Sequence, residues 1–557
     1  MSAFLQELEA RSVDPAGRRW LFVPYDQLSD AVGPLSREDP DELGIVVVET
    51  TWKASRRPYH VQKLAWVLAN LRHFALEQAE RGVAVRLVTG DESYGRLLRP
   101  VARALGGLRT MRPAERELRA DLAALESGGL LEFVPHEGWM TTGEQFCRAF
   151  AGGRTWRMDA FYRLVRRETG ILMDDGKPLG GRFSFDADNR KPWRGDPPAP
   201  TPPEFPSDPI KQEVCELIEE RFAHHPGRLT PEALPATAAD ARKAWRWAKR
   251  HCLESFGPYE DAMSRASHGL FHTRISGLLN NLRLLPGRVV ADVERMDLPI
   301  ASQEGFIRQV LGWREFVRHV HEASDGLRSL PGDRAPEVAE RPGDAGFARW
   351  AGRRWPASTR PSRLDGGACP SSLGAAEALP AAYWGAESGL ACLDQVVSEV
   401  WQTGYGHHIT RLMVLSNVAT LLGVAPRELC DWFWVAYTDA YDWVVEPNVL
   451  GMGSFGLGDL FTTKPYVSGA AYIDRMSDYC GGCRFSPRKD CPLTALYWTF
   501  LERNQDRLEG NPRMAMPLRS LAKRKPERRE RDRRVALTTR SALAAGRPIR
   551  PEDPGAS

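Results

Sequence analysis

The pattern of apolar and polar positions changes along the chain and predicts two kinds of folding unit. Up to about residue 140, short apolar runs alternate with longer segments in which apolar residues recur every three or four positions. The strand-like runs are LFVPY, GIVVVET, VAVRLVTG and LLEFVPH, and the helical segments cover residues 60–81 and 114–127. Because strands that alternate with helices form βαβ crossovers, residues 1–140 are predicted to fold as an α/β domain with a parallel, Rossmann-like sheet. No G-x-G-x-x-G follows the first strand, so dinucleotide binding is not expected there.

The rest of the chain shows mostly the helical period. KQEVCELIEERF and DARKAWRWAKRHCLESF are typical of it, and an all-α domain is predicted over residues 209–521. Residues 141–208 are expected to hold a helical segment and an interdomain linker, because the later part is rich in Gly, Pro and Asp. Within the helical domain, residues 325–382 are expected to form a surface insertion. The basic tail, residues 522–557, is expected to be disordered, either as a nucleic-acid-binding arm or as a merely solvated segment.

Composition narrows the class of protein. The chain has 557 residues, 42% of them hydrophobic, which is enough for two cores, and no apolar run approaches the ~20 residues that span a bilayer. We expect a soluble, cytoplasmic protein with no membrane contact. The net charge of +3 is too small to argue for a polyanionic partner by itself. Nine cysteines without a recognisable signal peptide indicate a reducing compartment and argue against a disulfide framework.

Four of the cysteines have a spacing that suggests metal chemistry. Cys480 and Cys483 form a C-x-x-C motif, and Cys491 follows after a short basic loop. Cys392, upstream in GLACLD, is a candidate fourth ligand. Two thiolates at this spacing can hold a tetrahedral zinc ion or two corners of an iron-sulfur cluster. The spacing alone therefore leaves structural zinc, a cluster, and free or redox-active thiols open.

A histidine pair lies in the run YGHHITRLMV. His407 and His408 are neighbours on a predicted helix, so their side chains point about 100° apart. At most one of them can face a ligand squarely while the other supports it. Histidines that simply bond to the backbone of their helix are the alternative.

Two further stretches are candidates for cofactor contacts. FGPYEDAMSRASHGLFHTRISGLLNN places hydroxyl groups and backbone donors at a helix start, which suits a pyrophosphate, although ordinary helix capping is the alternative. In GWREFVRHVH, Trp313 is either a core residue or a cofactor contact, and Arg314 is costly to bury without a partner. The candidates in the first stretch are Tyr259, His272, Thr273, Arg274, Ile275 and Ser276.

Several of these runs together resemble a known family. YGHHITRLMV, DAYDWVVEPNVLGM, TKPYVSGAAYIDRMSDYCGGC and CPLTALYW are similar to segments of the iron-sulfur bacterial cryptochromes and photolyases, which include prokaryotic (6-4) photolyases. The likeness covers nearly the whole chain. It implies the photolyase/cryptochrome architecture, FAD in the helical domain, UV-damaged DNA as the partner, and a monomer. The implied activity is blue-light-dependent repair of (6-4) pyrimidine-pyrimidone photoproducts through electron transfer from FAD, and the alternative is a cryptochrome-type photoreceptor that signals.

The resemblance also implies roles for particular residues. Cys392, Cys480, Cys483 and Cys491 would hold a 4Fe-4S cluster. The histidine pair would line the lesion pocket, where an imidazole near its ordinary pKa can give a proton to the lesion. The remaining implied roles are lesion or DNA binding by Tyr466, Tyr472 and Lys464, photoreduction through Trp432 and Trp384, and FAD contacts by the stretch from Tyr259 to Ser276 and by Gln309, Arg314, Arg411 and Asp439.

The sequence departs from the family pattern in the α/β domain. Relatives carry an antenna chromophore there, often 6,7-dimethyl-8-ribityllumazine, and the corresponding pocket would lie at Asp26, Gln27 and Leu28 and near Glu49. Tyr25 stands where relatives have Gly, and Lys53 stands where an acidic contact is expected. Both changes argue against an unchanged antenna site.

Two more departures concern the flavin. Phe433 occupies the position between Trp432 and Trp384 where a relative has Tyr, so photoreduction is expected to be slow or to detour through Trp434 or Tyr437. Val445 occupies the position beside the central ring of the flavin, where polar or acidic groups occur elsewhere.

Overall fold

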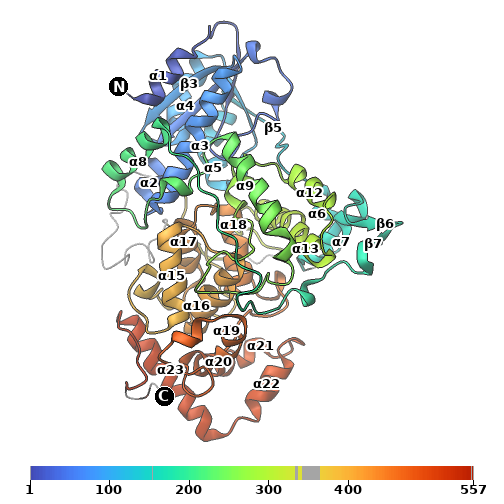
Figure 1. Cartoon of the computed structure of the whole chain (residues 1–557), viewed down its shortest axis with the longest axis vertical. Coiled ribbons are helices and arrows are strands. Elements are labelled where there is room, and N and C mark those ends of the chain that lie inside the picture. Colours follow the sequence, from blue (N-terminus) through green and yellow to red (C-terminus); the bar gives the residue numbers. More distant parts are fainter. Residues whose placement is uncertain (1, 154, 333–335, 341–363, 554, 556–557) are drawn as a thin grey trace.

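The computed structural model describes the whole chain apart from residues 1, 154, 333–335, 341–363, 554 and 556–557. Most of the middle of the expected insertion over residues 325–382 lies outside the described residues. The molecule is elongated, with the N-terminal domain at one end, a body of helices in the middle and the last helices of the chain at the other end (Figure 1). None of the described helices is long and apolar enough to cross a membrane.

The N-terminal domain is built on a parallel sheet, as the sequence predicts. The strands lie in the order β3-β2-β1-β4-β5, and every neighbouring pair is parallel. In the longest strand, Ile45, Val46 and Val47 are all 0% exposed, because both faces of the sheet are covered. LRTM, a short and mixed run, was not recognised as a strand from its pattern. The bounds are β1 Arg19–Phe22, β2 Leu43–Thr50, β3 Ala84–Gly90, β4 Leu108–Met111 and β5 Leu131–Val134.

Helices flank this sheet. The predicted segments 60–81 and 114–127 correspond to α3 and α5, and α8 (Pro209–Phe222) also belongs here because it packs on α1 and α3. Ile210 of α8 joins the apolar cluster that contains Phe74 of α3, and Glu213 pairs with Arg72. The chain past residue 209 therefore covers the sheet before it enters the helical half. The other bounds are α1 Ala3–Ala10, α2 Trp52–Arg56, α3 Val61–Glu80, α4 Tyr94–Ala104 and α5 Arg116–Glu126.

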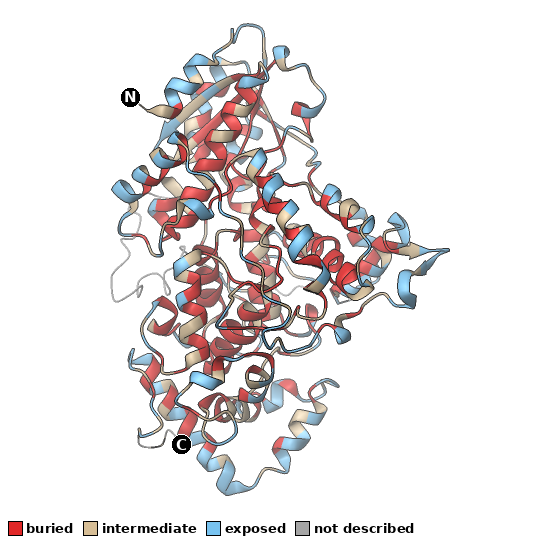
Figure 2. Ribbon diagram, in the orientation of Figure 1, coloured by how far each residue is buried: buried red, intermediate tan, exposed pale blue. Residues whose placement is uncertain are grey.

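The second half of the molecule is helical, and its buried residues run continuously through the central helices (Figure 2). Before it, α6 and α7 lead to the small hairpin of β6 and β7, which projects from the body (Figure 1). A second small pair, β8 and β9, joins the two described ends of the insertion. The bounds are α6 Gly143–Ala149, α7 Met158–Thr169, β6 Met173–Asp174, β7 Lys177–Pro178, β8 Val338–Ala339 and β9 Gly367–Ala368.

The helices of this half are short and are interrupted by three π-helical segments. These are η6 (Arg308–Arg314), η9 (Thr410–Ser416) and η10 (Glu446–Gly453). Segments of this type are frequent at functional sites, and two of the three carry predicted flavin contacts. The α-helices are α9 Ala238–His251, α10 Leu253–Phe256, α11 Ser276–Asn280, α12 Pro286–Glu294, α13 Ile300–Ile307, α14 Glu315–Ala323, α15 Ala391–Thr403, α16 Asn417–Leu422, α17 Pro426–Ala436, α18 Asp442–Val445, α19 Ala470–Met476, α20 Pro492–Arg503, α21 Gln505–Leu508, α22 Ala515–Ala522 and α23 Pro526–Ala544.

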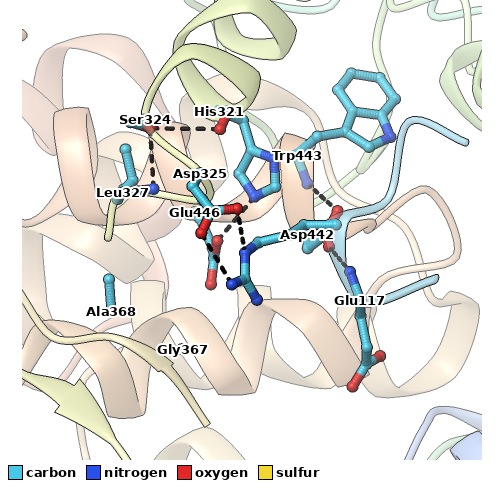
Figure 3. Close-up of polar contacts among 12 residues, drawn as sticks. Glu117, His321, Ser324, Asp325, Leu327, Gly367, Ala368, Asp442, Trp443 and Glu446 are labelled. Carbon is cyan, nitrogen blue, oxygen red and sulfur yellow. Dashed lines mark hydrogen bonds and ion pairs between the residues drawn. The ribbon is translucent and has the colours of Figure 1, made fainter. Parts of the chain in front are cut away.

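A buried polar contact joins the two halves at α18, and further buried contacts lie beside it within the helical half (Figure 3). The carboxylate of Asp442 accepts a hydrogen bond from the backbone N–H of Glu117, at the start of α5, at 3.0 Å. Glu446 lies 2.9 Å from His321 Nε2 and accepts from Arg427 Nη1 at 2.7 Å. Burial alone would raise the pKa of Glu446, but the Arg427 guanidinium and the His321 contact lower it to about 2. These contacts fix α18 and η10 from both sides.

The expectation of a disordered basic tail is wrong. Residues 526–544 form α23, which packs along α20. Val535, Ala536, Ala542 and Leu543 are buried in this contact, and acidic residues between the arginines neutralise part of the charge. The ion pairs are Arg524–Asp532, Arg533–Glu502 and Arg533–Glu530. The tail is folded rather than disordered because apolar residues at helical spacing follow the charged run.

Candidate functional site

Three histidines from two segments meet in the helical half. His272 lies before α11, and His407 and His408 lie just before η9. The rings of His407 and His272 are stacked, with centroids 4.3 Å apart and planes 10° from parallel, and His408 meets His272 edge-on at 5.3 Å. In the described part of the chain, neither ring nitrogen of His407 has a hydrogen-bond partner, and nor does Nε2 of His272. Buried polar atoms normally have partners, so these atoms mark a place where a bound molecule fits.

Burial shifts all three imidazoles towards the neutral form. Desolvation is the main cause, and it lowers the pKa of His272 and His407 well below the ordinary value, helped by the neighbouring His408. Desolvation and the nearby Arg308 guanidinium lower the pKa of His408 to about 4. The protein by itself therefore does not keep a histidine here near its ordinary pKa. Negative charge brought in by a ligand would raise these pKa values again.

A buried ion pair lies beside the histidines. Arg411 Nη2 lies 3.0 and 3.1 Å from the two carboxylate oxygens of Asp439, and Ser276 Oγ donates to the same carboxylate at 2.7 Å. Burial alone would raise the pKa of Asp439, but Arg411 and the Ser276 hydrogen bond outweigh it, and the pKa is lowered. The Arg411 guanidinium also lies 3.9 Å from the ring centroid of Tyr437, whose hydroxyl has no partner among the described residues. Unpaired polar atoms and a fixed charge pair thus lie side by side, and we call this group of residues the histidine pocket.

The predicted phosphate-binding stretch is brought to this pocket, but most of its polar groups bind protein. Ser276 bonds to Asp439, as described, and Tyr259 Oη donates to the backbone oxygen of Asp196 at 3.1 Å. Arg274 has a left-handed backbone with φ of 55°, and its guanidinium lies 4.6 Å over the ring of Tyr405. The other members, Thr273 and Ile275, are buried. His272 is the member whose side chain faces the histidine pocket with an unpaired nitrogen.

Gln309 and Arg314, the two candidate flavin contacts in η6, also bond to other protein groups. Gln309 Nε2 donates to Glu260 at 2.6 Å. Arg314 donates to the backbone oxygen of Leu279 at 3.1 Å and pairs with Glu315 at 3.2 Å. Burial lowers the pKa of Arg314 to about 10. Both side chains support the walls of the pocket in this structure, and their contact with a flavin stays a prediction.

Tyr472, a predicted lesion contact, lies beside a segment that the sequence suggested was mostly linker. Tyr472 Oη donates to Asp261 at 3.4 Å, and Arg190 Nε lies 3.7 Å from the same carboxylate. Burial and the nearby Asp186 raise the pKa of Asp261 to about 6. Asp186 also acts electrostatically on His408 and Tyr466. The segment from Asp186 to Arg190 therefore lies against the histidine side of the pocket.

The four predicted ligand cysteines line one cavity. Cys392 is in the first turn of α15, Cys480 and Cys483 belong to or follow a 3-10 turn, and Cys491 precedes α20. All four are free thiols, and apolar side chains such as Ile473 and Phe485 form the remaining walls. No group of three or more His, Cys, Asp or Glu side chains is arranged to hold a metal ion in the described part of the chain. Burial, helped by the other cysteines nearby, raises the pKa of Cys392, and burial raises that of Cys491 to about 12. Thiolates at this place would therefore need compensating positive charge nearby.

Comparison with known proteins agrees with this architecture. A model of the deoxyribodipyrimidine photo-lyase-related protein family matches residues 21–234. The chain is 32% identical over 521 residues to a (6-4) photolyase of Agrobacterium fabrum, covering 90% of this chain and 95% of that protein. The chain belongs to the photolyase-related family.

Two further matches are consistent with that membership. An uncharacterised protein of Acanthamoeba polyphaga mimivirus is 33% identical over 98 residues, which cover 18% of this chain and 76% of that protein. The crystal structure of a bacterial class III photolyase from Agrobacterium tumefaciens superposes with a TM-score of 0.52 at 14% identity, covering 96% and 99% of the two chains. This second likeness concerns the fold alone, and it confirms the photolyase architecture predicted from the sequence.

The antenna cleft of this photolyase-related protein is filled by its own side chains. Tyr25 is 5% exposed, and its ring stacks on Tyr441 with centroids 6.3 Å apart. Its hydroxyl donates to Glu115, and the ammonium of Lys53 bonds both Tyr25 and Glu115. Asp26 is 3% exposed, and burial raises its pKa to about 7. A cleft whose groups bond one another does not fit a chromophore at the expected position.

The expected photoreduction residues of this photolyase-related protein are buried but separate. Trp432 is 0% exposed and Trp384 is 8% exposed, and the structure gives no ring contact between these two described residues. Phe433 packs against Trp432 at 5.3 Å and stacks on Tyr437 at 5.3 Å. Val445 is buried in α18.

Sequence reasoning missed Asp186, Arg190, Glu260 and Asp261, which line or support the histidine side of the pocket. The run GGRFSFDADNRKPW could have indicated a functional segment, because a cluster of acidic and basic residues is unusual in a linker. Its own sequence does not indicate which helix it contacts. Residues 186 and 408 are far apart in the sequence and meet only in the fold.

Proposed function

We propose that this chain is a light-dependent DNA repair enzyme, a (6-4) photolyase with bound FAD. The observation that carries the proposal is the group of buried, unpaired imidazole nitrogens beside the Arg411–Asp439 ion pair. The family membership and the resemblance of the site residues support the same function. When bound, FAD supplies an electron that no amino-acid side chain can deliver after excitation by blue light.

Residues of this chain would balance the charge of the bound flavin and hold the groups that transfer protons. The guanidinium of Arg411, held by Asp439, is a fixed positive charge beside the proposed flavin, and it offsets negative charge that accumulates on reduction. His407 stacks on His272, and this stack fixes the plane of the His407 ring. His408 lies beside this stack, where the carboxylate of Asp186 acts electrostatically both on it and on Tyr466. We propose that His408, supported by His407, gives a proton to the lesion, since phosphates of a bound strand raise its pKa from about 4.

DNA binding is proposed for the face that carries Lys464, Tyr466 and Tyr472. A groove of about 640 Å³ opens beside Thr463 and is lined by Arg157, Arg507 and Arg513. Arginines at a groove next to a lesion pocket suit contacts with phosphates, which make the affinity salt-dependent. A damaged base reaches the pocket by flipping out of the duplex, at a lower cost where the lesion has already weakened stacking.

We also propose that Cys392, Cys480, Cys483 and Cys491 hold a 4Fe-4S cluster. A cluster takes its ligands from around a cavity, which is how these four thiols are arranged. Iron and sulfide analysis with visible absorption tests this, because the cluster absorbs separately from flavin. Cys483→Ser should lose iron, whereas Cys147→Ser, an exposed thiol elsewhere, should keep it. Equal iron in both variants contradicts the assignment.

An antenna chromophore is not part of the proposed function, because the expected cleft is closed by Tyr25, Lys53 and Glu115. Chromatography of the ligands released by denaturation should yield FAD without a lumazine. A lumazine in stoichiometric amount would show that the cleft opens or that the chromophore binds elsewhere.

The deciding experiment is repair of an oligonucleotide with one defined (6-4) photoproduct under blue light, with a cyclobutane dimer as the parallel substrate. We expect light-dependent repair of the (6-4) lesion, at least tenfold less in His408→Asn, since general acid catalysis contributes roughly 10²–10⁴-fold. His73→Asn, on α3 and paired with Asp208, is the matched control and should repair normally. Bound flavin without repair in light would favour the photoreceptor alternative, and repair in darkness would contradict the enzyme proposal.

A further inference from the structure

Trp401 fills the gap between the two buried tryptophans of the expected photoreduction chain. It lies in α15, and its ring stacks on Trp384 with centroids 5.5 Å apart and planes 18° from parallel. It meets Trp432 edge-on at 5.8 Å. The three indoles therefore form a continuous series of ring contacts from the buried end at Trp432 to the pair of Trp401 and Trp384. Trp401 is only partly buried, so the outer end of the series reaches solvent.

A single backbone carbonyl holds two of these rings. The indole Nε1–H of Trp432 donates to the backbone oxygen of Tyr383 at 2.8 Å, and that of Trp401 donates to the same oxygen at 2.9 Å. Tyr383 is 0% exposed and directly precedes Trp384 in the sequence. All three tryptophans are thus positioned by one short turn, η8 (Ala381–Trp384). The shared carbonyl therefore keeps the rings of Trp401 and Trp432 in fixed contact, and a short, fixed distance between rings favours electron exchange.

The electrostatic surroundings also favour Trp401 over the other candidates. Tyr437 contacts Trp432 at 6.0 Å, but the Arg411 guanidinium lies 3.9 Å over its ring and its hydroxyl has no acceptor among the described residues. Trp434 has the Arg57 guanidinium 4.1 Å over its ring. A cation over a ring opposes removal of an electron from it, because a second positive charge would form beside the first.

Trp401 has a neutral neighbour instead. His60 stacks on it at 5.8 Å, and burial lowers the pKa of His60 to about 4, so this imidazole is uncharged at neutral pH. Among the described residues, no cation lies over the ring of Trp401 or Trp432, in contrast to Trp434 and Tyr437. Phe433, at the position where a relative has tyrosine, is much harder to oxidise than any of the three indoles. Tyr383 also contacts Trp432, at 5.4 Å, but its hydroxyl donates to the backbone oxygen of Leu415, which is not a base that can take up the proton a tyrosine loses on oxidation. Trp401 is therefore the oxidisable ring best placed to exchange electrons with Trp432.

We propose that Trp401 relays electrons between Trp384 and Trp432 and so takes over the role lost at position 433. The proposal rests on the proposed binding of FAD in the helical half. With FAD bound, light excitation would draw one electron from Trp432, Trp401 would return an electron to Trp432, and the resulting electron vacancy would be shared by the stacked Trp401 and Trp384. An external thiol then returns one electron to that pair. The flavin gains one electron, the thiol loses one, and no covalent bond in the three tryptophans forms or breaks.

The first test is blue-light photoreduction of the purified holoprotein with a thiol donor, combined with transient absorption of tryptophan radicals. Trp401→Phe should bind flavin normally and photoreduce it at least tenfold more slowly, which is about 1.4 kcal/mol on the barrier. The long-lived tryptophan radical should disappear in the same variant. Trp434→Phe exchanges a buried indole outside the series and should behave as the unaltered protein. Flavin-loaded Trp401→Phe with an unaltered rate would overturn the relay.

A second variant keeps the proposal testable if Trp401→Phe does not fold. Phe433→Tyr restores an oxidisable ring at the family position without touching Trp401. If Trp401 already relays electrons, Phe433→Tyr should change the photoreduction rate by less than about twofold. A large acceleration would mean that the chain lacks a working relay and would overturn the proposal. A preparation without flavin absorbance would instead refute the proposed function, so the two failures are distinguishable.

Discussion

The cleft at the carboxyl edge of the sheet and the histidine pocket of the helical half both bury charged groups, but they satisfy them differently. In the cleft, Tyr25, Lys53 and Glu115 bond one another. In the pocket, His407 leaves both ring nitrogens without a described partner beside the Arg411–Asp439 pair. Buried groups that hydrogen-bond one another are typical of a structural contact between domains. Buried polar atoms without a hydrogen-bond partner, beside a fixed charge pair, are typical of a ligand site. Variants in the two regions should therefore have different consequences.

The largest effect is expected from Asp439→Asn. The exchange leaves the buried Arg411 guanidinium without its counter-charge, which costs about 3–5 kcal/mol for a broken buried pair. The free energy of unfolding measured by chemical denaturation should fall, and so should the flavin-to-protein absorbance ratio. The same exchange in the cleft, Asp26→Asn, should leave the flavin ratio unchanged, because that carboxyl has a pKa of about 7 and is largely protonated already below that pH. Equal flavin loss in both variants would show that the two regions do not differ in their contribution to flavin binding.

A smaller loss, in stability alone, is expected from Glu115→Gln. The Lys53 ammonium loses its nearest carboxylate and keeps Glu117 at 3.7 Å, so about 1–3 kcal/mol should be lost, as for other buried hydrogen-bonding groups. The melting temperature should fall while flavin content and repair per folded molecule remain unchanged. Loss of flavin would mean that the cleft contributes to the cofactor site after all.

The pH dependence of stability provides a third test. Burial raises the pKa of Asp26 from its usual 3.8 to about 7 in the folded protein, so the folded state binds more protons than the unfolded state between these values. Stability should fall as pH rises through this window, and Asp26→Asn should remove that part of the dependence. Between pH 6 and 8 the difference in unfolding free energy between the two proteins should change by about 1.4 kcal/mol. Parallel stability curves for the two proteins would show that Asp26 titrates normally.

The smallest effect is expected at the rim of the pocket. Tyr472→Phe removes a long, partly buried hydrogen bond to Asp261, and about 0.5–1 kcal/mol of binding to damaged DNA should be lost. Fluorescence anisotropy with lesion-containing and undamaged oligonucleotides measures this. Lysine substitution of a residue on the far hairpin, Asp174→Lys, is a control for charge alone. If Tyr472→Phe binds damaged DNA with unchanged affinity, the Tyr472 hydroxyl does not contribute to lesion binding.

The sequence predicted those parts of the molecule whose determinants are local. The apolar run of β2 and the helical period of α3 are complete within their own residues, and both were confirmed. β4 was missed because LRTM becomes a strand only between its neighbours. The resemblance named Cys392 together with three cysteines about ninety residues away, and these four thiols do line one cavity.

Contacts between distant segments explain what the sequence did not predict. The segment at Asp186 meets the histidine pocket only after the chain has folded back, and its composition alone reads as linker. Trp401, in SEVWQTG, reads as an ordinary core position, because nothing in its own neighbourhood indicates that Trp432 will contact it from another helix. Tail residues 526–544 were misread for the same reason, since their apolar positions find their main partner in α20, far from them in the local pattern.

The last helix, α23, is synthesised after all four cysteines. Arg531 of this helix donates to the backbone oxygen of Lys489, in the loop that leads to Cys491. Docking of α23 therefore helps to hold the loop that leads to Cys491, and a chain cut before residue 526 would lack this contact.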